Sequence, residues 1–281
     1  MLDPYLLPNG TLQNRLGTDD PSELLRREDQ LVSLRQTVLA RTRPSAPFDF
    51  NKLSEIHRYL FQDVYEWAGK PRSCDLRKAA YSDSDESPKQ FTPSSKIKAE
   101  ADRIFGTLIR KNELRGLNPG DFTDSAAELF VEINNLHPFR EGNGRAQRFF
   151  LSALAENAGH ELAFDVVTKE RMIEVSVAGI DGDVAGAKRL FKEISDPRRV
   201  RALRKALNFL KKSNSVPWND LYIATTTAGQ AYAGVLVGMA GNDYMMRVSG
   251  DPQDWIAVGE IDDLPENSSG GDDLILTAKR F

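Results

Sequence analysis

The residues best suited to chemistry lie together in the twelve-residue segment HPFREGNGRAQR, residues 137–148. It combines a histidine, a glutamate, two glycines, an asparagine and three arginines. An imidazole near a phosphate can accept a proton from an attacking hydroxyl group. A carboxylate beside phosphates suits Mg²⁺, which keeps several waters and bridges phosphate oxygens. The segment therefore predicts chemistry on a phosphate-bearing ligand, with His137 as base and Glu141 as metal ligand.

The second half of this segment predicts an anion site at a helix start. Gly142 and Gly144 let the backbone approach a ligand closely, and the first N–H groups of a helix attract anions. Arg145 and Arg148 are three residues apart, so both project from the first turn towards one ligand. Their guanidinium groups can each bind phosphate oxygens in pairs. Asn143 is expected to orient a phosphate oxygen or the loop itself.

Two helical patterns must position these groups. Apolar residues recur at helical spacing over residues 125–136 and again over 144–158. His137 then ends the first helix, the arginines begin the second, and Phe139 anchors the intervening loop in the core. Taken singly, such residues are usually caps, turns or surface salt bridges. Their joint occurrence within twelve residues indicates a site.

The same periodicity predicts further helices at residues 21–40, 49–67, 94–112, 168–178, 183–194 and 196–211. His57 lies beside an apolar stripe, which indicates a structural rather than a catalytic histidine. Residues 1–20 contain several prolines and glycines and predict an irregular surface arm. In the helix that follows this arm we place five residues on the buried face: Leu24, Leu25, Leu31, Leu34 and Val38.

Two regions show strand patterns. Residues 72–80 and 91–92 predict a β-hairpin with a charged tip at 82–88, although a disordered loop explains the tip equally well. Beyond Pro217, β-branched residues and a period of two predict strands at 221–225, 230–237, 244–248, 255–258 and 274–278. Ala228-Gly229 and Gly241-Asn242 are expected to be hairpin turns. Five short strands favour a small closed barrel, of the OB type.

Composition excludes several classes of protein. The 281 residues are 40% hydrophobic with a net charge of −4, which permits packed cores but does not favour general nucleic-acid binding. Ten acidic residues in 217–281 oppose such binding by the barrel in particular. Cys74 is alone, so no intrachain disulfide forms and a reducing origin is expected. No apolar run is long enough to cross a bilayer.

The segment HPFREGNGRAQR resembles the signature of Fic-domain proteins, His-x-Phe-x-Asp/Glu-Gly-Asn-Gly-Arg-x-x-Arg, with every specified position present. Residues 56–61 and 64–70 look like the family's second conserved region, and the resemblance covers about residues 15–195. The layout is similar to the Bartonella effector proteins (Bep family), which join a Fic domain to an OB fold. Those proteins usually continue into a secretion-signal domain, so we expect this chain to be a fragment.

The resemblance implies a mainly α chain in four parts. An N-terminal arm spans residues 1–20, and an all-helical Fic domain with a β-hairpin flap spans 21–197. A helical connector at 198–216 then leads to an OB-like barrel at 217–281.

The resemblance also implies an activity, the transfer of AMP from ATP to a Ser, Thr or Tyr hydroxyl of a target protein. His137 would deprotonate that hydroxyl, which attacks the α-phosphate as pyrophosphate leaves. Glu141 would hold Mg²⁺ between the α- and β-phosphates. The implied nucleotide-binding residues are Gly142, Asn143 and Gly144 as an anion nest with Asn143 on the α-phosphate, Arg145 on the β-phosphate, Arg148 on the γ-phosphate, and also Phe139, Ala146 and Gln147.

The hairpin matches the family's flap, which pins the target segment by strand addition. Arg77, Lys78, Phe91 and Thr92 are the expected target-binding residues, and Thr92 replaces the family's usual alanine. The expected target is a protein with an exposed hydroxyl residue, for example a host GTPase. Specific nucleic-acid binding is not expected. The implied location is the bacterial cytoplasm, followed by type IV secretion into a host cell.

Many family members are restrained by a helix with the pattern Ser/Thr-x-x-x-Glu-Gly/Asn, whose glutamate pairs with the second arginine of the motif. Residues 152–157 fit this pattern, but they lie on the motif's own helix, where Glu156 is about two turns beyond Arg148. We interpret the match as coincidence. A separate, small antitoxin-like protein that supplies a glutamate to Arg148 is therefore expected.

Two alternatives remain open at this point. The same fold could transfer UMP, phosphocholine or phosphate, although Glu141 argues against the kinase-like members, in which this acid is replaced. The chain could also be an effector interaction module with an idle site, against which the intact motif counts.

Overall fold

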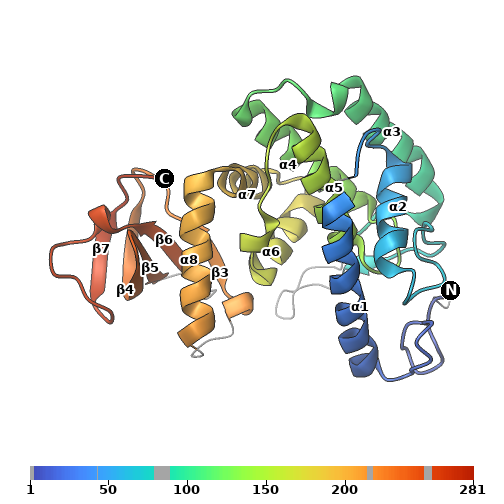
Figure 1. The fold of residues 1–281 in the computed structure, drawn as a ribbon, viewed down its shortest axis with the longest axis horizontal. Helices are drawn as coiled ribbons and strands as arrows, with labels where there is room; N and C mark the ends of the chain where they lie inside the picture. The colour runs from blue at the N-terminus through green and yellow to red at the C-terminus, as the bar shows by residue number, and fades with distance from the viewer. Residues whose placement is uncertain (1–2, 43, 79–88, 214–217, 250–254) are drawn as a thin grey trace. The chain divides into compact units, whose positions relative to one another are not determined.

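Eight α-helices precede a five-stranded sheet in residues 3–42, 44–78, 89–213, 218–249 and 255–281, which the structure, a computed structural model, describes (Figure 1). The predicted mainly α chain with a small C-terminal β part is confirmed. The chain divides into two compact units, Met1–Glu161 with Gly179–Val184, and Leu162–Ala178 with Ala185–Phe281. The four-part division expected from the sequence stays a prediction.

The first unit is built from five helices. They are α1 (Pro21–Thr42), α2 (Phe50–Phe61), α3 (Ile97–Arg110), α4 (Pro119–Leu136) and α5 (Asn143–Ala158). Polar caps fix two of the starts, since Asp49 accepts the Lys52 N–H and Asn118 accepts the Asp121 N–H. α2 packs between α1 and α5, and Figure 1 shows α1 and α2 side by side. The two helices predicted around the motif are thus α4 and α5.

Two details of these helices differ from the sequence-based expectation. α2 ends at Phe61 rather than at residue 67, because the N–H groups of Val64 and Tyr65 both bond to the Phe61 carbonyl and begin a series of turns. The predicted buried face of α1 is wrong in part. Leu25, Leu34 and Val38 are exposed, and the buried positions are Leu24, Glu28, Val32 and Leu39.

A short hairpin is confirmed between α2 and α3. Its strands are β1 (Arg77–Lys78) and β2 (Lys89–Gln90), paired antiparallel. β1 is shorter than predicted, and β2 lies two residues earlier than predicted, so Phe91 and Thr92 follow the strand. The predicted charged tip at 82–88 falls outside the described residues.

The second unit combines helices with the sheet. The helices are α6 (Lys169–Ile180, of which residues up to 178 belong here), α7 (Ala185–Ser195) and α8 (Pro197–Ser213). The strands are β3 (Tyr222–Thr225), β4 (Ala231–Ala240), β5 (Asp243–Val248), β6 (Trp255–Glu260) and β7 (Asp273–Thr277), in the order β3-β6-β5-β4-β7. β3 runs parallel to β6, and the other neighbours are antiparallel.

Of the two predicted hairpin turns, one is found. Gly241-Asn242 joins the paired strands β4 and β5. The hairpin predicted at Ala228-Gly229 is wrong, because β3 pairs with β6 and not with β4. Closure of the sheet into an OB-type barrel stays a prediction, since no pairing between β3 and β7 occurs among the described residues.

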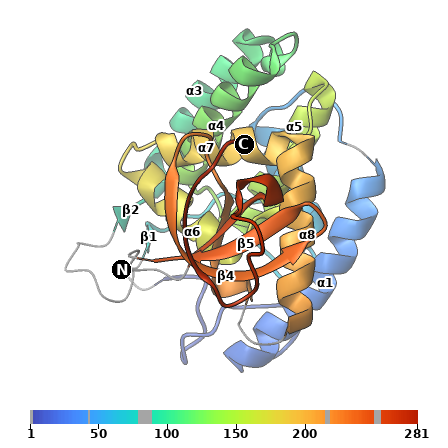
Figure 2. The same ribbon diagram turned by 90° about the vertical axis from the view of Figure 1, so that its left-hand side faces the viewer.

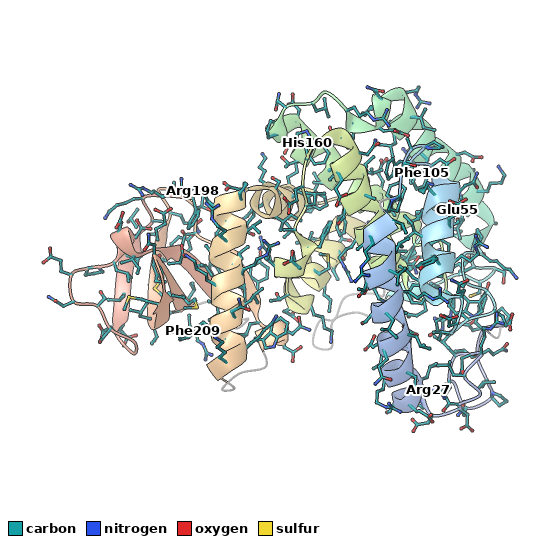
Figure 3. The ribbon with its side chains drawn as sticks, in the orientation of Figure 1. Arg27, Glu55, Phe105, His160, Arg198 and Phe209 are labelled. Atoms are coloured by element: carbon teal, nitrogen blue, oxygen red, sulfur yellow. The ribbon has the colours of Figure 1, made fainter. Side chains whose placement is uncertain are left out.

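Helix α8 runs alongside the sheet in both ribbon views (Figures 1 and 2). Phe209 of α8 packs on Gly238 of β4, where a side chain on the glycine would strike the phenyl ring (Figure 3). A buried ion pair joins Arg171 of α6 to Glu193 of α7, and both groups also bind β3. No helix in the described part of the chain has the length and apolarity to cross a membrane.

Candidate active site

The predicted chemistry lies on a tight loop between α4 and α5. His137 caps α4 in the left-handed conformation, with φ 41° and ψ 61°, and its N–H bonds to the Ile133 carbonyl over 3.1 Å. Gly142, with φ 82°, precedes α5. The loop therefore begins at the predicted base and ends at the start of a helix.

The buried imidazole of His57 anchors this loop from α2. Its ring stacks on Phe139 with 3.9 Å between centroids, and Phe139 is fully buried. The Gly69 N–H donates to Nδ1, so Nε2 carries the hydrogen and donates to the Glu141 carbonyl, each over 2.8 Å. Burial lowers the pKa of His57 from its ordinary 6.5 to about 4. The structural role predicted for His57 is confirmed, as is the anchoring role of Phe139.

Asn143 holds the loop closed from the other end. Its side-chain oxygen accepts the Phe139 N–H over 2.8 Å, and its side-chain nitrogen donates to the Phe139 carbonyl over 2.7 Å. These two bonds confirm that Asn143 orients the loop, which is one of the two roles expected for it. The contact with an α-phosphate stays a prediction.

Gly142 makes the loop's closest approach to the core. A Cβ atom built on it would lie 2.3 Å from the Cζ atom of Phe61, which no real contact permits. Glycine is therefore required twice at this position, for the positive φ and for the space. The phenyl ring of Phe61 in turn stacks on His57, with 4.7 Å between centroids.

The start of α5 has the properties of an anion site. Gly142 provides no side-chain cap, so the first N–H groups of the helix have no capping acceptor from that residue. The Arg148 guanidinium lies over this end, with Nη1 3.2 Å from the place a Cβ on Gly144 would take. Burial and the neighbouring Arg145 cation lower the pKa of Arg148. A desolvated cation at the N-terminus of a helix favours a bound anion.

Arg145 differs from Arg148 in its partners. Its guanidinium is hydrogen-bonded to Glu28 of α1 and lies 3.3 Å from Asp29 and 3.5 Å from Glu141. It also sits over the Phe61 ring, 4.8 Å from the centroid. The two arginines predicted to act together thus have opposite electrostatic surroundings.

The ring of His137 is oriented by the end of the flap. It stacks on Phe91 with 3.8 Å between centroids and 14° between planes. Thr92 fastens the same segment to α4, because its N–H and its hydroxyl both donate to the Asn135 carbonyl over 3.0 Å. The side chain of Phe91 is buried and lies against the predicted base. Arg77, by contrast, is exposed.

Arg72 connects the flap to the catalytic loop, although the sequence analysis did not select it. Its guanidinium is buried and donates to four carbonyls, those of Cys74 and Thr92 at the two ends of the flap and those of Leu136 and His137 at the end of α4. Its backbone N–H donates to Pro138. In the sequence, Arg72 could be noticed only as an arginine that follows Gly69 and Pro71, the residues predicted to end the preceding helix.

The remaining predicted nucleotide-binding residues point away from the loop. Ala146 is fully buried and its N–H bonds to the Gly142 carbonyl over 3.1 Å. Gln147 is also buried, and its side chain donates to the Phe130 carbonyl of α4 over 2.5 Å. Contact between these two residues and a nucleotide stays a prediction.

Glu141 is the group that could hold a cation. Its side chain is 45% exposed, and one oxygen accepts the Gly142 N–H over 2.8 Å. No cluster of three or more His, Cys, Asp or Glu side chains suited to a metal occurs among the described residues. One carboxylate beside an anion site fits Mg²⁺, which proteins often bind through one or two carboxylates and the substrate's phosphates.

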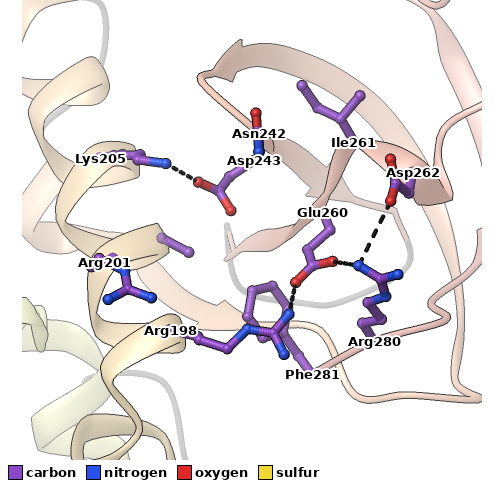
Figure 4. A pocket seen from close by; sticks show the side chains of 11 residues that line it. Arg198, Arg201, Lys205, Asn242, Asp243, Glu260, Ile261, Asp262, Arg280 and Phe281 are labelled. Atoms are coloured by element: carbon purple, nitrogen blue, oxygen red, sulfur yellow. Dashed lines mark hydrogen bonds and ion pairs between the residues drawn. The ribbon is translucent and has the colours of Figure 1, made fainter.

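The second unit contains a polar groove of about 430 Å³ between α8 and the sheet (Figure 4). Besides Arg201, its cations pair with acids at short range: Lys205 with Asp243, and Arg198 and Arg280 with Glu260. Opposite charges that neutralise one another leave little attraction for an ionic ligand. We assign no site to this groove.

The pKa of His57 predicts how stability depends on pH. Between about pH 6.5 and pH 4 the unfolded chain binds a proton that the folded protein does not, so the free energy of unfolding must fall as the pH falls. The loss amounts to roughly 3 kcal/mol at about 1.4 kcal/mol per pKa unit. Urea unfolding of the wild type and of His57→Gln across this window measures it. An equal dependence on pH in both proteins would contradict the assignment.

The contact between Gly142 and Phe61 predicts a difference between two glycine variants. Gly142 and Gly159 have φ angles of 82° and 84°, but a Cβ on Gly159 would meet nothing within 4 Å. Gly159→Ala should lose about 1–2 kcal/mol of unfolding free energy, from the left-handed conformation alone. Gly142→Ala should lose about 1–3 kcal/mol more through overpacking. Equal losses in urea unfolding would show that the ring moves aside freely.

Comparison with known proteins confirms the family predicted from HPFREGNGRAQR. Residues 47–155 match the Fic/DOC family. The chain is 33% identical over 294 residues to a protein adenylyltransferase of Bartonella henselae, an alignment that covers 98% of this chain and 52% of that relative. This chain therefore spans about half the length of that protein.

Solved structures agree in fold. The type IV secretion system effector protein BepA is 32% identical, with a TM-score of 0.86 over 99% of this chain and 96% of that one. BepC of Bartonella tribocorum, solved with bound AMPPNP, is 34% identical, with a TM-score of 0.62 over 69% of this chain and 96% of that one. By its motif, its fold and these similarities, the chain belongs to the Fic/DOC family.

Proposed function

We propose that this protein is an adenylyltransferase that moves AMP from ATP to a hydroxyl group of a target protein. The observation that carries the proposal is the loop of residues 137–143. It joins an oriented imidazole to a helix start that carries the desolvated cation of Arg148. An alcohol and a polyphosphate can meet there, and relatives of this chain carry the same activity in their names.

In the proposed reaction, His137 accepts the proton of the target hydroxyl as its oxygen attacks the α-phosphorus of ATP. A new P–O bond forms to the target while the bond to the β-phosphate oxygen breaks. Pyrophosphate leaves with the electron pair of that bond. The His137 ring is fixed for this step by its stack on Phe91 and by the hydrogen bond from Arg72 to its carbonyl. Such a reaction depends mainly on positioning and on stabilising charge.

The start of α5 holds the phosphates in this scheme. Its N–H groups and Gly144 approach the α-phosphate, Arg145 binds the β-phosphate, and Arg148 binds the γ-phosphate. Glu141 would hold Mg²⁺, which would supply positive charge beside the phosphates. The partly exposed carboxylate of Glu141 supports this assignment. AMPPNP bound to the similar BepC structure supports ATP as the nucleotide.

The target and the setting follow from the flap and from the relatives. A target segment would add to the flap strand β2 and bring its hydroxyl to His137. Similarity to a type IV secretion effector favours a bacterial protein that acts on host proteins after secretion. A separate inhibitor that supplies a glutamate to Arg148 would block the γ-phosphate position. The desolvated guanidinium of Arg148 at the start of α5 suits such a partner.

Labelled ATP tests the proposal directly. The protein is incubated with Mg²⁺, a host-cell lysate, and ATP labelled on either the α- or the γ-phosphate. A protein band labelled only from the α-phosphate is the expected result. A band labelled from the γ-phosphate would indicate phosphate transfer instead, and no label despite bound ATP would indicate an idle interaction module.

His137→Ala should abolish transfer while leaving nucleotide binding intact. Removal of a positioned base typically slows such a step about 10²–10⁴-fold, and the side chain does not hold the phosphates in this scheme. Transfer rates and calorimetric ATP affinities measure the two effects separately. The matched control is His160→Gln at the far end of α5, which should keep the wild-type rate. Wild-type transfer by His137→Ala would refute the assignment of the base.

Arg148→Ala should weaken ATP binding about 10–100-fold, the loss expected for a charge-assisted contact of about 1.5–3 kcal/mol. AMP lacks the γ-phosphate and should bind both proteins equally. Calorimetry with the two nucleotides gives the comparison. An equal loss of affinity for ATP and AMP would show that Arg148 does not bind the γ-phosphate.

A further inference from the structure

Helix α1 carries a carboxylate on its buried face. The buried positions of the helix are Leu24, Glu28, Val32 and Leu39, so an acid occupies a place in an otherwise apolar stripe. Glu28 is 3% exposed. A buried carboxylate is costly unless it is paired and hydrogen-bonded, and an apolar residue at such a position is often at least as stable. Stability alone therefore gives a weak reason for the acid.

Each oxygen of Glu28 has its own partner. Oε1 accepts a hydrogen bond from Nη2 of Arg145, and Oε2 accepts one from the hydroxyl of Tyr65. Tyr65 is 1% exposed and stacks on Trp67 with 4.2 Å between centroids. Burial and the Glu28 charge raise the pKa of Tyr65, so its hydroxyl remains a donor at neutral pH. Tyr65 therefore fixes the carboxylate that holds Arg145.

The guanidinium of Arg145 is consequently fixed on two sides. Glu28 holds one edge, and the Phe61 ring lies under its plane at 4.8 Å. Two other carboxylates are farther from it and more exposed: Asp29 at 3.3 Å is 63% exposed, and Glu141 at 3.5 Å is 45% exposed. Glu28 is therefore the buried one of the three carboxylates that pair with Arg145.

We propose that Glu28, held by Tyr65, is a positioning residue that fixes Arg145 for the polyphosphate of the bound nucleotide. The inference rests on the proposed function, in which Arg145 binds the β-phosphate. It extends the site to α1, more than a hundred residues before the motif in the chain.

Glu28→Gln tests the inference because it keeps the shape of the side chain and removes its charge. ATP should bind roughly tenfold more weakly to the variant, as expected when a charge-assisted contact is disturbed. AMP should bind as tightly as to the wild type, because it has no β-phosphate. Asp29→Asn is the matched control, since this exposed acid faces the same guanidinium. Its effect should stay below about twofold.

A double-mutant cycle separates positioning from a general loss of structure. If Glu28 acts through Arg145, Glu28→Gln should change ATP affinity little once Arg145→Ala is present. Tyr65→Phe removes one hydroxyl and should weaken ATP binding in the same direction, by less. If the melting temperature shows that Glu28→Gln does not fold, Tyr65→Phe provides the test of the inference.

Several outcomes would overturn the inference. They are unchanged ATP affinity in folded Glu28→Gln, equal losses for ATP and AMP, and an undiminished loss in the Arg145→Ala background. Unchanged ATP affinity in Tyr65→Phe would overturn it where Glu28→Gln does not fold. A wild-type protein that binds no ATP would instead contradict the proposed function itself, and this inference with it.

Discussion

The hydrogen bond between buried His57 and the Glu141 carbonyl is the constraint on which the site depends. His57 belongs to α2, and Glu141 and Phe139 belong to the loop, so this bond and the stack on Phe139 fix the loop to the core. Gly142 can then pass against Phe61, and α5 begins without a side-chain cap. The loop is thus held by groups that do not themselves face the proposed ligand.

The charges around α5 are arranged unequally, and this asymmetry gives the two motif arginines different properties. Arg145 is surrounded by three carboxylates from two parts of the chain, whereas burial and the Arg145 cation lower the pKa of Arg148. A cation with fixed partners keeps one geometry, which suits a group that must orient a ligand. A desolvated cation without an acid partner gains most from an incoming anion. The site therefore combines Arg145, which carboxylates hold in place, with Arg148, a desolvated cation that can bind an incoming anion.

Much of this was predictable from the sequence, because it is encoded locally. The two motif helices and the structural role of His57 follow from residue types at short spacing. The contacts of Arg72 were not predictable, since its guanidinium meets carbonyls up to 65 residues away. The buried face of α1 was predicted wrongly because the prediction considered apolar residues only, and one of the buried positions is Glu28. The hairpin predicted at Ala228-Gly229 failed for a related reason, as β3 finds its partner in the distant β6.

A crystal structure with a non-hydrolysable ATP analogue and Mg²⁺ tests the central claim most directly, that the loop anchored by His57 presents a polyphosphate to His137. The account predicts that the α-phosphate lies against the first N–H groups of α5, with Arg148 on the far end of the polyphosphate and the His137 ring facing the α-phosphorus. A nucleotide bound elsewhere, or one whose phosphates point away from His137, would contradict it.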